Sequence, residues 1–202
     1  MSKKETKHDN LPKHQRRIVL CLAKEGPLII TETNKKLKGE YTSTNRAFHK
    51  LEKKGLIQRV GIRPYRGQEF PRYWLTFESI IFSILEGANI DKLLSYAKEC
   101  LPKNVDTDRV LATIESAKYL DPRLLQHLYS LLRQKEQLQP MDIVLLTIQA
   151  GMTQGITFEK GIEQMKIIMN VFEKYPRLNK ELKDAWKDTK KVIHEVERVV
   201  KP

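Results

Sequence analysis

The sequence predicts a mainly α protein: three short helices and a small β-hairpin come first, and an all-helical domain follows. Apolar residues recur at helical spacing in most segments. Two runs, residues 56–63 and 70–76, are rich in aliphatic and aromatic residues and flank a stretch with proline and glycine, which is typical of a hairpin. After Thr76, cap residues, glycines and prolines separate segments that again have helical spacing.

The N-terminal segment divides into a tail and a helix. Residues 1–10 are polar and lysine-rich, so we expect a disordered basic tail without the apolar stretch of a secretory signal. Pro12 suits a first helical turn, and apolar residues follow it at helical spacing. Gly26, with a proline after it, is expected to end this helix.

A short strand and a second helix are expected next. Residues 28–30 are all aliphatic and suit a strand. Thr31 is placed to cap a short helix through Leu37, and Gly39 is expected to end it.

The third helix is expected to have two distinct faces. Thr42 or Ser43 can cap it, and Gly55 ends it. The residues spaced i, i+3, i+4 and i+7 on its apolar face are Thr44, Ala47, Phe48 and Leu51. The residues on its other face are Asn45, Arg46, His49, Lys50 and Lys53. A helix of this kind buries the first face and exposes the second.

Seven further helices are expected after Thr76. Their predicted positions are residues 77–86, 89–100 with Asn89 as cap, 106–120 with Asp106 or Thr107 as cap, 121–138, 140–151, 157–175 and 178–201. We place the first three helices and the hairpin in a first domain, residues 11–88. Residues 89–202 are then an all-helical domain for dimerisation or for a protein partner.

The positive charge of the chain is concentrated in its first part. The 202 residues have a net charge of +12. Residues 1–90 contain 18 Lys and Arg against 9 Asp and Glu, whereas residues 91–202 contain 19 against 16. A local excess of this kind favours a polyanionic partner, with nucleic acid ahead of a membrane surface. No apolar run approaches the ~20 residues that a membrane span needs.

The segments STNRAFHKLEKKGLIQR and YWLT resemble the winged helix-turn-helix DNA-binding domain of bacterial and archaeal regulators of the MarR and PadR type. Such regulators have a Ser/Thr-rich helix start, Arg-Ala, then Leu-x-x-x-Gly-Leu-Ile and a strand that ends in Tyr-x-Leu-Thr. The resemblance covers about residues 12–77 and is specific only at the level of the superfamily. It implies a recognition helix in the DNA major groove and a wing on the flanking backbone or minor groove.

The chemistry of the third helix fits a recognition helix. Thr42 and Ser43 offer hydroxyls near its start, where the helix dipole favours phosphates. Asn45 can pair with adenine, and Arg46 with guanine. The residues one and two turns later, which we expect to contact the DNA backbone, are His49, Lys50 and Lys53.

The predicted hairpin is rich in arginine. Its four arginines are Arg59, Arg63, Arg66 and Arg72. Arg63 and Arg66 flank Tyr65 at the predicted tip, and an arginine at a wing tip can enter a narrow minor groove. Tyr65 either packs on a sugar or on Arg66, or is an ordinary exposed turn residue. The aromatic residues of the second strand are expected to cover a core rather than to stack on bases: Phe70, Tyr73 and Trp74.

The sequence contains no motif of a known enzyme or cofactor site. No His pair, Cys/His pattern, glycine-rich phosphate loop or serine elbow is present. Asp106 and Asp108 are expected to lie at a helix start as caps rather than to hold a metal. Cys21 and Cys100 lie in apolar helical patterns and are expected to be buried thiols in a reducing cytosol. We therefore expect no enzyme activity, no cofactor and no metal.

The last helix has a heptad-like seam of apolar and small residues: Leu178, Leu182, Ala185, Thr189, Val192, Val196 and Val199. The seam can pair with its copy in a homodimer or pack on the preceding helix. We favour internal packing for part of it and a dimer overall, because two recognition helices read two half-sites. Four methionines are expected to fill the core rather than to line a ligand pocket: Met141, Met152, Met165 and Met169.

The predicted function is that of a cytoplasmic, nucleoid-associated transcriptional regulator that binds double-stranded DNA. Two alternatives remain open. One is a winged-helix scaffold for protein–protein contacts, and the other is a plasmid or viral replication or segregation protein that uses the same fold on DNA.

Overall fold

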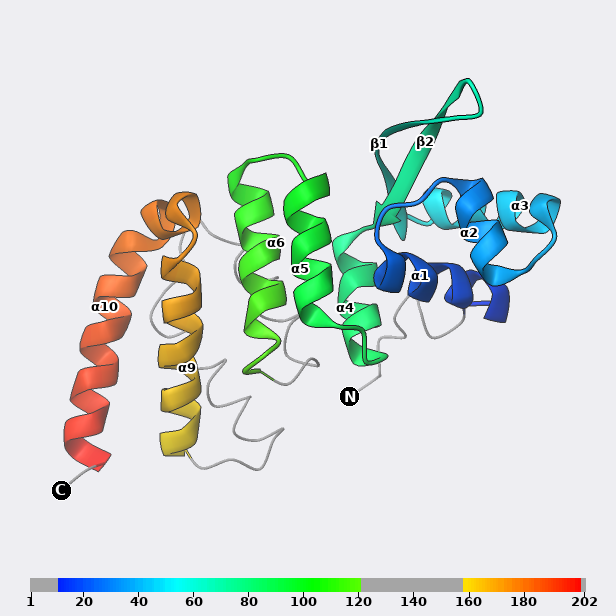
Figure 1. The fold of residues 1–202 in the computed structure, drawn as a ribbon. Coiled ribbons are helices and arrows are strands. Elements are labelled where there is room, and N and C mark those ends of the chain that lie inside the picture. The colour runs from blue at the N-terminus through cyan, green and yellow to red at the C-terminus, as the bar shows by residue number, and fades with distance from the viewer. Residues whose placement is uncertain (1–10, 121–157, 201–202) are drawn as a thin grey trace. The chain divides into compact units, whose positions relative to one another are not determined.

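The computed structural model describes residues 11–120 and 158–200, and the chain divides into two units, residues 1–101 and 102–202 (Figure 1). The elements of the first unit are α1 (Lys13–Glu25), α2 (Ile30–Leu37), α3 (Tyr41–Lys53), β1 (Ile57–Tyr65), β2 (Gln68–Leu75), α4 (Phe77–Leu85) and α5 (Ile90–Cys100). The described elements of the second unit are α6 (Val105–Ser116), α9 (Phe158–Glu173) and α10 (Pro176–Val200). The prediction of a mainly helical chain with a small hairpin after three helices is confirmed. The expected tail 1–10 and the expected helices 121–138 and 140–151 lie outside the described residues.

The core of the first unit is formed by α1, α3 and the base of the hairpin. Ile18 and Leu22 of α1 and Phe48 of α3 have no exposed surface. The Phe48 ring meets the Tyr73 ring of β2 edge to face, with 5.2 Å between the ring centroids. Trp74 is also fully buried, so the expectation that these aromatic residues cover a core is confirmed for Tyr73 and Trp74. Burial of such rings is the largest single apolar contribution that a core receives.

The hairpin is longer and its turn is shorter than the sequence predicts. Strands β1 and β2 pair in antiparallel register up to Tyr65 opposite Gln68 (Figure 1). Arg66 and Gly67 therefore form the whole turn, and both have positive φ, +51° and +77°. This combination belongs to the type I′ turn, whose twist matches that of the paired strands. The expected six-residue loop at 64–69 is thus wrong, because Pro64 and Glu69 are already paired strand residues.

The predicted start of α2 and the predicted strand before it are both corrected by the structure. Helix α2 begins at Ile30, one residue before Thr31. The Glu32 carboxylate accepts a hydrogen bond at 3.3 Å from the N–H of Ile29, the residue that precedes the helix. The expected strand at 28–30 is reduced to one bridge, between Leu28 and Tyr73. A glutamate side chain that reaches back in this way replaces a hydroxyl cap.

The residues that cap α3, α5 and α6 agree with the sequence prediction for α5 alone. Glu40 precedes α3, so Thr42 and Ser43 lie within its first turn and are not caps. Asn89 caps α5 as expected, since its side chain accepts from the Lys92 N–H at 3.0 Å. Asn104 caps α6 in place of Asp106 or Thr107, because its side chain accepts from the Thr107 N–H at 2.8 Å.

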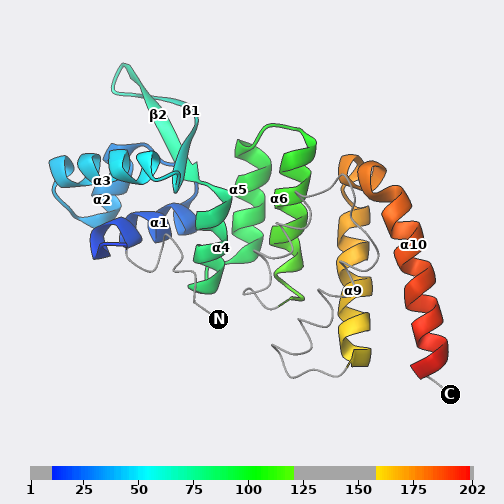
Figure 2. The ribbon, with the colours of Figure 1, turned by 180° about the vertical axis from the view of Figure 1, so that it is seen from behind.

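Helix α5 belongs to the first unit, although the predicted boundary between residues 88 and 89 assigned it to the second. Helices α4 and α5 both pack on α1 (Figure 2). The Tyr96 ring of α5 meets the Trp74 ring edge to face, and the Tyr96 hydroxyl donates to the Lys24 carbonyl at 3.4 Å. Apolar residues of α5 that complete this core are Leu93, Leu94 and Ala97.

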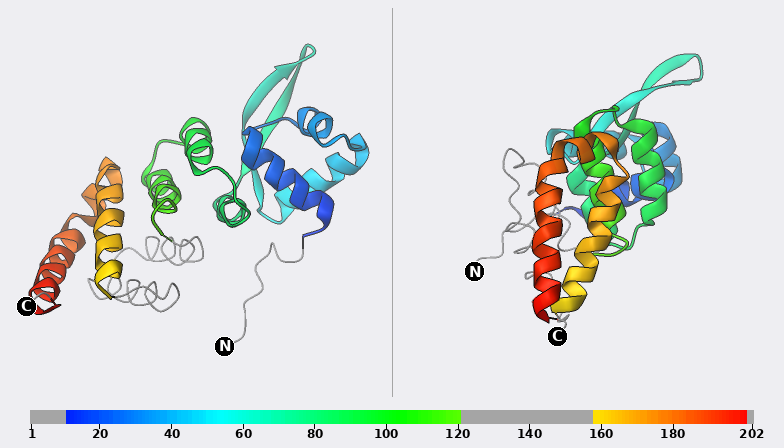
Figure 3. Two further views of the ribbon diagram at one scale, coloured as in Figure 1. Left: turned by 60° about the horizontal axis from the view of Figure 1, so that its bottom comes forward. Right: turned by 90° about the vertical axis from the view of Figure 1, so that its left-hand side faces the viewer.

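The described part of the second unit is a set of three packed helices. Helices α9 and α10 lie side by side, joined at a sharp corner, and α6 packs on both (Figure 3). Glu115 of α6 accepts hydrogen bonds from the Lys174 ammonium at 2.7 Å and the Tyr175 hydroxyl at 2.6 Å. Burial tends to raise the pKa of Glu115, but these two hydrogen bonds outweigh it and lower that pKa. The carboxylate therefore stays charged and ties α6 to the corner.

The expected seam of α10 is described at one position. Leu178 is fully buried, whereas the side chains of the other six seam residues lie outside those that the structure describes. Met169 is buried in the core as expected; the other three methionines of that prediction are not described at the level of side chains. None of the helices in the described ranges combines the length and the apolar character that a membrane crossing requires.

We predict that Gly26→Ala destabilises the first unit by about 3 kcal/mol, whereas Gly87→Ala costs about 1 kcal/mol. Gly26 has φ +83° and ψ −162°, a region that is nearly restricted to glycine, and an added Cβ would lie 2.7 Å from the Tyr96 ring. Gly87 has φ +84° but open space around the same position. Urea denaturation followed by Trp74 fluorescence in a Trp186→Phe background measures the difference. Equal losses for the two variants would contradict the packing of α5 on the Gly26 turn.

Candidate nucleic-acid interface

Helix α3 presents the face that the sequence predicts. Its apolar residues are buried, namely Thr44, Ala47, Phe48 and Leu51. The predicted contact residues of α3 that are exposed are Thr42, Ser43, Arg46, His49, Lys50 and Lys53. Asn45 is half-buried. The division into a buried and an exposed face is therefore confirmed.

A buried polar contact determines which face of α3 turns outward. The Thr44 hydroxyl, which has no exposed surface, donates a hydrogen bond to Asn34 Oδ1 of α2 at 2.8 Å. His14 Nε2 of α1 lies 3.4 Å from the same hydroxyl oxygen. Because a buried hydroxyl without a partner is costly, this contact opposes rotation of α3 about its axis. The three N-terminal helices are thus joined at one point behind the exposed face.

Three cations on the exposed face of α3 have no ion-pair partner among the described residues. They are Arg46, Lys50 and Lys53. His49 is different, because its Nδ1 lies 3.9 Å from Glu52 Oε2. Glu52 also accepts from Arg59 Nε at 2.8 Å, and this contact raises the pKa of Arg59. The exposed face is therefore strongly positive at the places where the sequence expects contacts with DNA.

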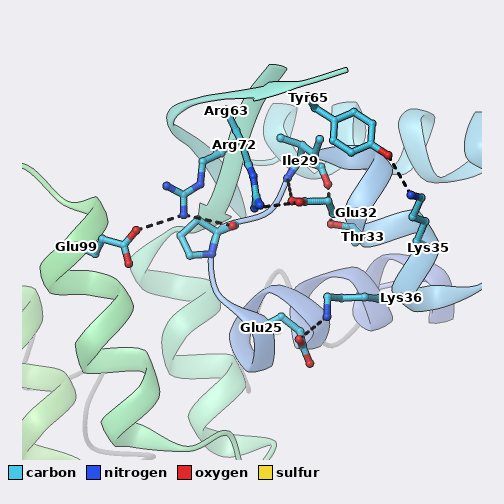
Figure 4. A network of polar contacts seen from close by, with 11 residues as sticks. Glu25, Ile29, Glu32, Thr33, Lys35, Lys36, Arg63, Tyr65, Arg72 and Glu99 are labelled. Carbon is cyan, nitrogen blue, oxygen red and sulfur yellow. Dashed lines mark hydrogen bonds and ion pairs between the residues drawn. The ribbon is translucent and has the colours of Figure 1, made fainter. Parts of the chain in front are cut away.

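Most of the hairpin arginines interact with groups inside the unit. Arg63 Nη1 lies 2.9 Å from Glu32 Oε1 of α2 (Figure 4). Arg72 Nη2 lies 3.3 Å from Glu99 Oε1 and 3.5 Å from the Pro27 carbonyl oxygen. A carboxylate partner lowers the charge that such an arginine offers to a phosphate. Arg63 and Arg72 are therefore less available to a polyanion than the sequence predicts.

Arg66 is the arginine that remains at the tip. Its guanidinium lies over the Tyr65 ring, 5.5 Å from the ring centroid. The Tyr65 hydroxyl accepts a hydrogen bond from Lys35 Nζ of α2 at 3.0 Å (Figure 4). This hydrogen bond, together with the nearby charge of Arg66, lowers the pKa of Tyr65 below its usual value. Tyr65 therefore links the hairpin tip to α2 and packs on Arg66, which is one of the roles that the sequence left open.

Glu32 and Lys35 are structural members of this interface that the sequence reasoning missed. The Glu32 carboxylate receives both the Ile29 N–H at the start of α2 and the Arg63 guanidinium of the hairpin (Figure 4). Its side chain is 19% exposed, so water screens these contacts only in part. The position of Glu32 three residues after Ile29 is the one signal that could have indicated its capping role.

Two exposed apolar side chains were also missed. Tyr41, the first residue of α3, is 47% exposed, and Ile62 of β1 is 65% exposed. Single exposed apolar residues are common on protein surfaces, but Tyr41 lies on the same helix as the unpaired cations.

No group of three or more His, Cys, Asp or Glu side chains within residues 11–120 and 158–200 is arranged to hold a metal ion. Cys21 and Cys100 are free and half-buried. Burial raises the pKa of both thiols, that of Cys100 to about 11, so both are protonated near neutral pH. Asp108 is buried and Asp106 pairs with Arg109, so this DxD pair is divided between two different environments.

No protein-family model, no curated protein and no solved structure matches the chain. The resemblance to winged helix regulators therefore stays an interpretation of the sequence between about residues 12 and 77.

We predict that Tyr65 ionises at a lower pH than Tyr73. The Lys35 hydrogen bond lowers the pKa of Tyr65, whereas burial raises the pKa of Tyr73. Lys35→Met should move the pKa of Tyr65 upward, because the donor and its charge are lost. Tyrosine Cζ chemical shifts in a ¹³C NMR titration measure both groups, with Tyr65→Phe for assignment.

Lys36→Met is the matched control, since Lys36 is the next residue and pairs with Glu25 instead of Tyr65. If Lys36→Met shifts the Tyr65 titration as much as Lys35→Met does, the specific contact between α2 and the hairpin tip is not present in solution.

Proposed function

We propose that the first unit is a winged helix-turn-helix domain that binds double-stranded DNA and that the protein regulates transcription. The observation that carries the proposal is the exposed face of α3, where Arg46, Lys50 and Lys53 lie without an ion-pair partner among the described residues. Cations left unpaired on one face are available to neutralise phosphates.

The dimensions of the elements support this proposal. Helix α2 is followed by a three-residue turn, residues 38–40, and then by α3. Helix α3 has 13 residues, hence a length of about 20 Å. With its side chains an α-helix is about 10–12 Å in diameter, so it fits the major groove, which is about 12 Å wide. The hairpin follows α3 directly and is positioned by Glu32 and Tyr65 against α2.

The proposed roles of the residues follow from their chemistry and exposure. Arg46 reads a guanine edge, with Asn45 beside it on the half-buried margin of the helix. Thr42 and Ser43 donate to phosphate at the start of α3. Lys50 and Lys53, with His49, contact the backbone, and Arg66 extends the contact from the hairpin tip. Arg63 acts mainly by holding the hairpin on Glu32.

The proposal that the protein regulates transcription rests on the presence of a second unit that can form a dimer. One recognition helix reads few base pairs, so selectivity requires two half-sites and a dimer. The C-terminal unit, which ends in the long helix α10, is the proposed place of dimerisation.

We predict that the protein binds duplex DNA with an affinity that falls steeply with salt, because bound lysine and arginine release counterions. On a duplex selected from a random pool, Arg46→Ala should weaken binding about 5- to 150-fold, and on a scrambled duplex by much less. Lys53→Ala should weaken binding to both duplexes similarly and reduce the salt slope by about 0.9. Fluorescence anisotropy titrations at several salt concentrations measure these effects.

Lys98→Ala, an exposed lysine on α5, is the control and should leave both titrations unchanged. Absence of salt-sensitive duplex binding by the unmodified protein would refute the proposal. Partners that remain bound in a pull-down after nuclease treatment would then point to the scaffold alternative.

A further inference from the structure

Helix α10 carries a stripe of basic residues along one side. Its exposed basic residues that share this side are Lys180, Lys183, Lys187, His194 and Arg198. At 100° per residue they lie within an arc of about 60°, and they extend along about 27 Å of the helix. We name these five residues the α10 stripe.

The described neighbours of the stripe form no ion pairs with it. None of its five residues has an ion-pair partner among the described residues. Ion pairs do occur along its two margins: Lys190 pairs with Glu173 of α9 at 2.5 Å, and Lys191 pairs with Asp188 at 3.3 Å. Among the described side chains, ion pairs thus occur at the edges of the stripe and none at its centre.

The basic residues of the stripe recur at the spacing of helical neighbours. Lys180 and Lys183 are three residues apart, and Lys183 and Lys187 are four apart, so their charges lie next to each other on the surface. In the sequence, Asp184, four residues after Lys180 and three before Lys187, offsets their repulsion within the helix.

The stripe fits nucleic acid better than a lipid surface. Its length of about 27 Å corresponds to about eight base pairs of duplex, along which phosphates recur regularly. Helices that lie on membranes insert their apolar side, but Leu178, which lies on the opposite side of α10 from the stripe, is fully buried within the protein. Helix α10 also packs on α9 (Figure 3).

We propose that the α10 stripe is a second nucleic-acid-binding surface, which holds the phosphate backbone of duplex DNA without reading its sequence. The surface is separate from α3 and does not depend on the recognition of bases by the first unit.

The test uses the full chain and a random-sequence duplex. The stripe variant Lys180→Gln/Lys183→Gln/Lys187→Gln keeps good helix formers at exposed positions, so circular dichroism should be unchanged. We expect its affinity to fall at least 10-fold at 0.1 M salt and its salt slope to fall by about 2 to 3. A charge-matched control, Lys92→Gln/Lys98→Gln/Lys103→Gln, should fall much less.

A third variant separates this surface from the proposed recognition helix. Arg46→Ala/Lys50→Ala/Lys53→Ala should retain salt-dependent duplex binding, and addition of the three stripe substitutions should abolish it. Equal effects of the stripe variant and the charge-matched control would overturn the inference while leaving the α3 proposal intact. Binding to anionic phosphatidylserine vesicles without binding to duplex, or no duplex binding by any variant, would overturn it as well.

Discussion

The structure of the first unit depends on how α3 buries its apolar face. Phe48, with no exposed surface, meets Tyr73 of the hairpin, and Thr44 donates to Asn34 of α2 behind it. One apolar and one polar contact thus hold the same face against two different elements. Since helical residues three and four apart share a face, this arrangement leaves Arg46, Lys50 and Lys53 exposed. The charge pattern at the surface is a direct consequence of packing in the core.

The same unit uses part of its positive charge to hold itself together. Glu32 binds Arg63, Glu52 binds Arg59 and Glu99 binds Arg72, so ion pairs with three helices, α2, α3 and α5, position the hairpin. Each of these pairs is partly exposed, so water screens it and its contribution to stability is modest. Their main effect is to orient the hairpin and to leave Arg66 as the basic group at its tip. The hairpin is rich in arginine, but three of its four guanidinium groups are already paired with carboxylates.

Patterns within single elements were predictable from the sequence, and contacts between elements were not. The two faces of α3 and the Asn89 cap depend on spacing over a few residues, and both are confirmed. The length of the hairpin was underestimated, because positive φ at Arg66, a residue that seldom adopts it, cannot be read from residue type. The ion pair of Glu32 with Arg63 joins residues 31 positions apart, and Tyr96 of α5 contacts Trp74 and Lys24, which are 22 and 72 positions away. No local pattern contains such contacts.

The most direct test of the account is lysine footprinting by mass spectrometry, in which surface amines are acetylated in the presence and absence of duplex DNA. The account predicts that bound duplex protects Lys50 and Lys53 on the exposed face of α3, whereas Lys36, which pairs with Glu25 on α1, keeps its reactivity. Unchanged reactivity of Lys50 and Lys53 in a sample shown to be saturated with duplex would contradict the central claim that this face of α3 contacts DNA.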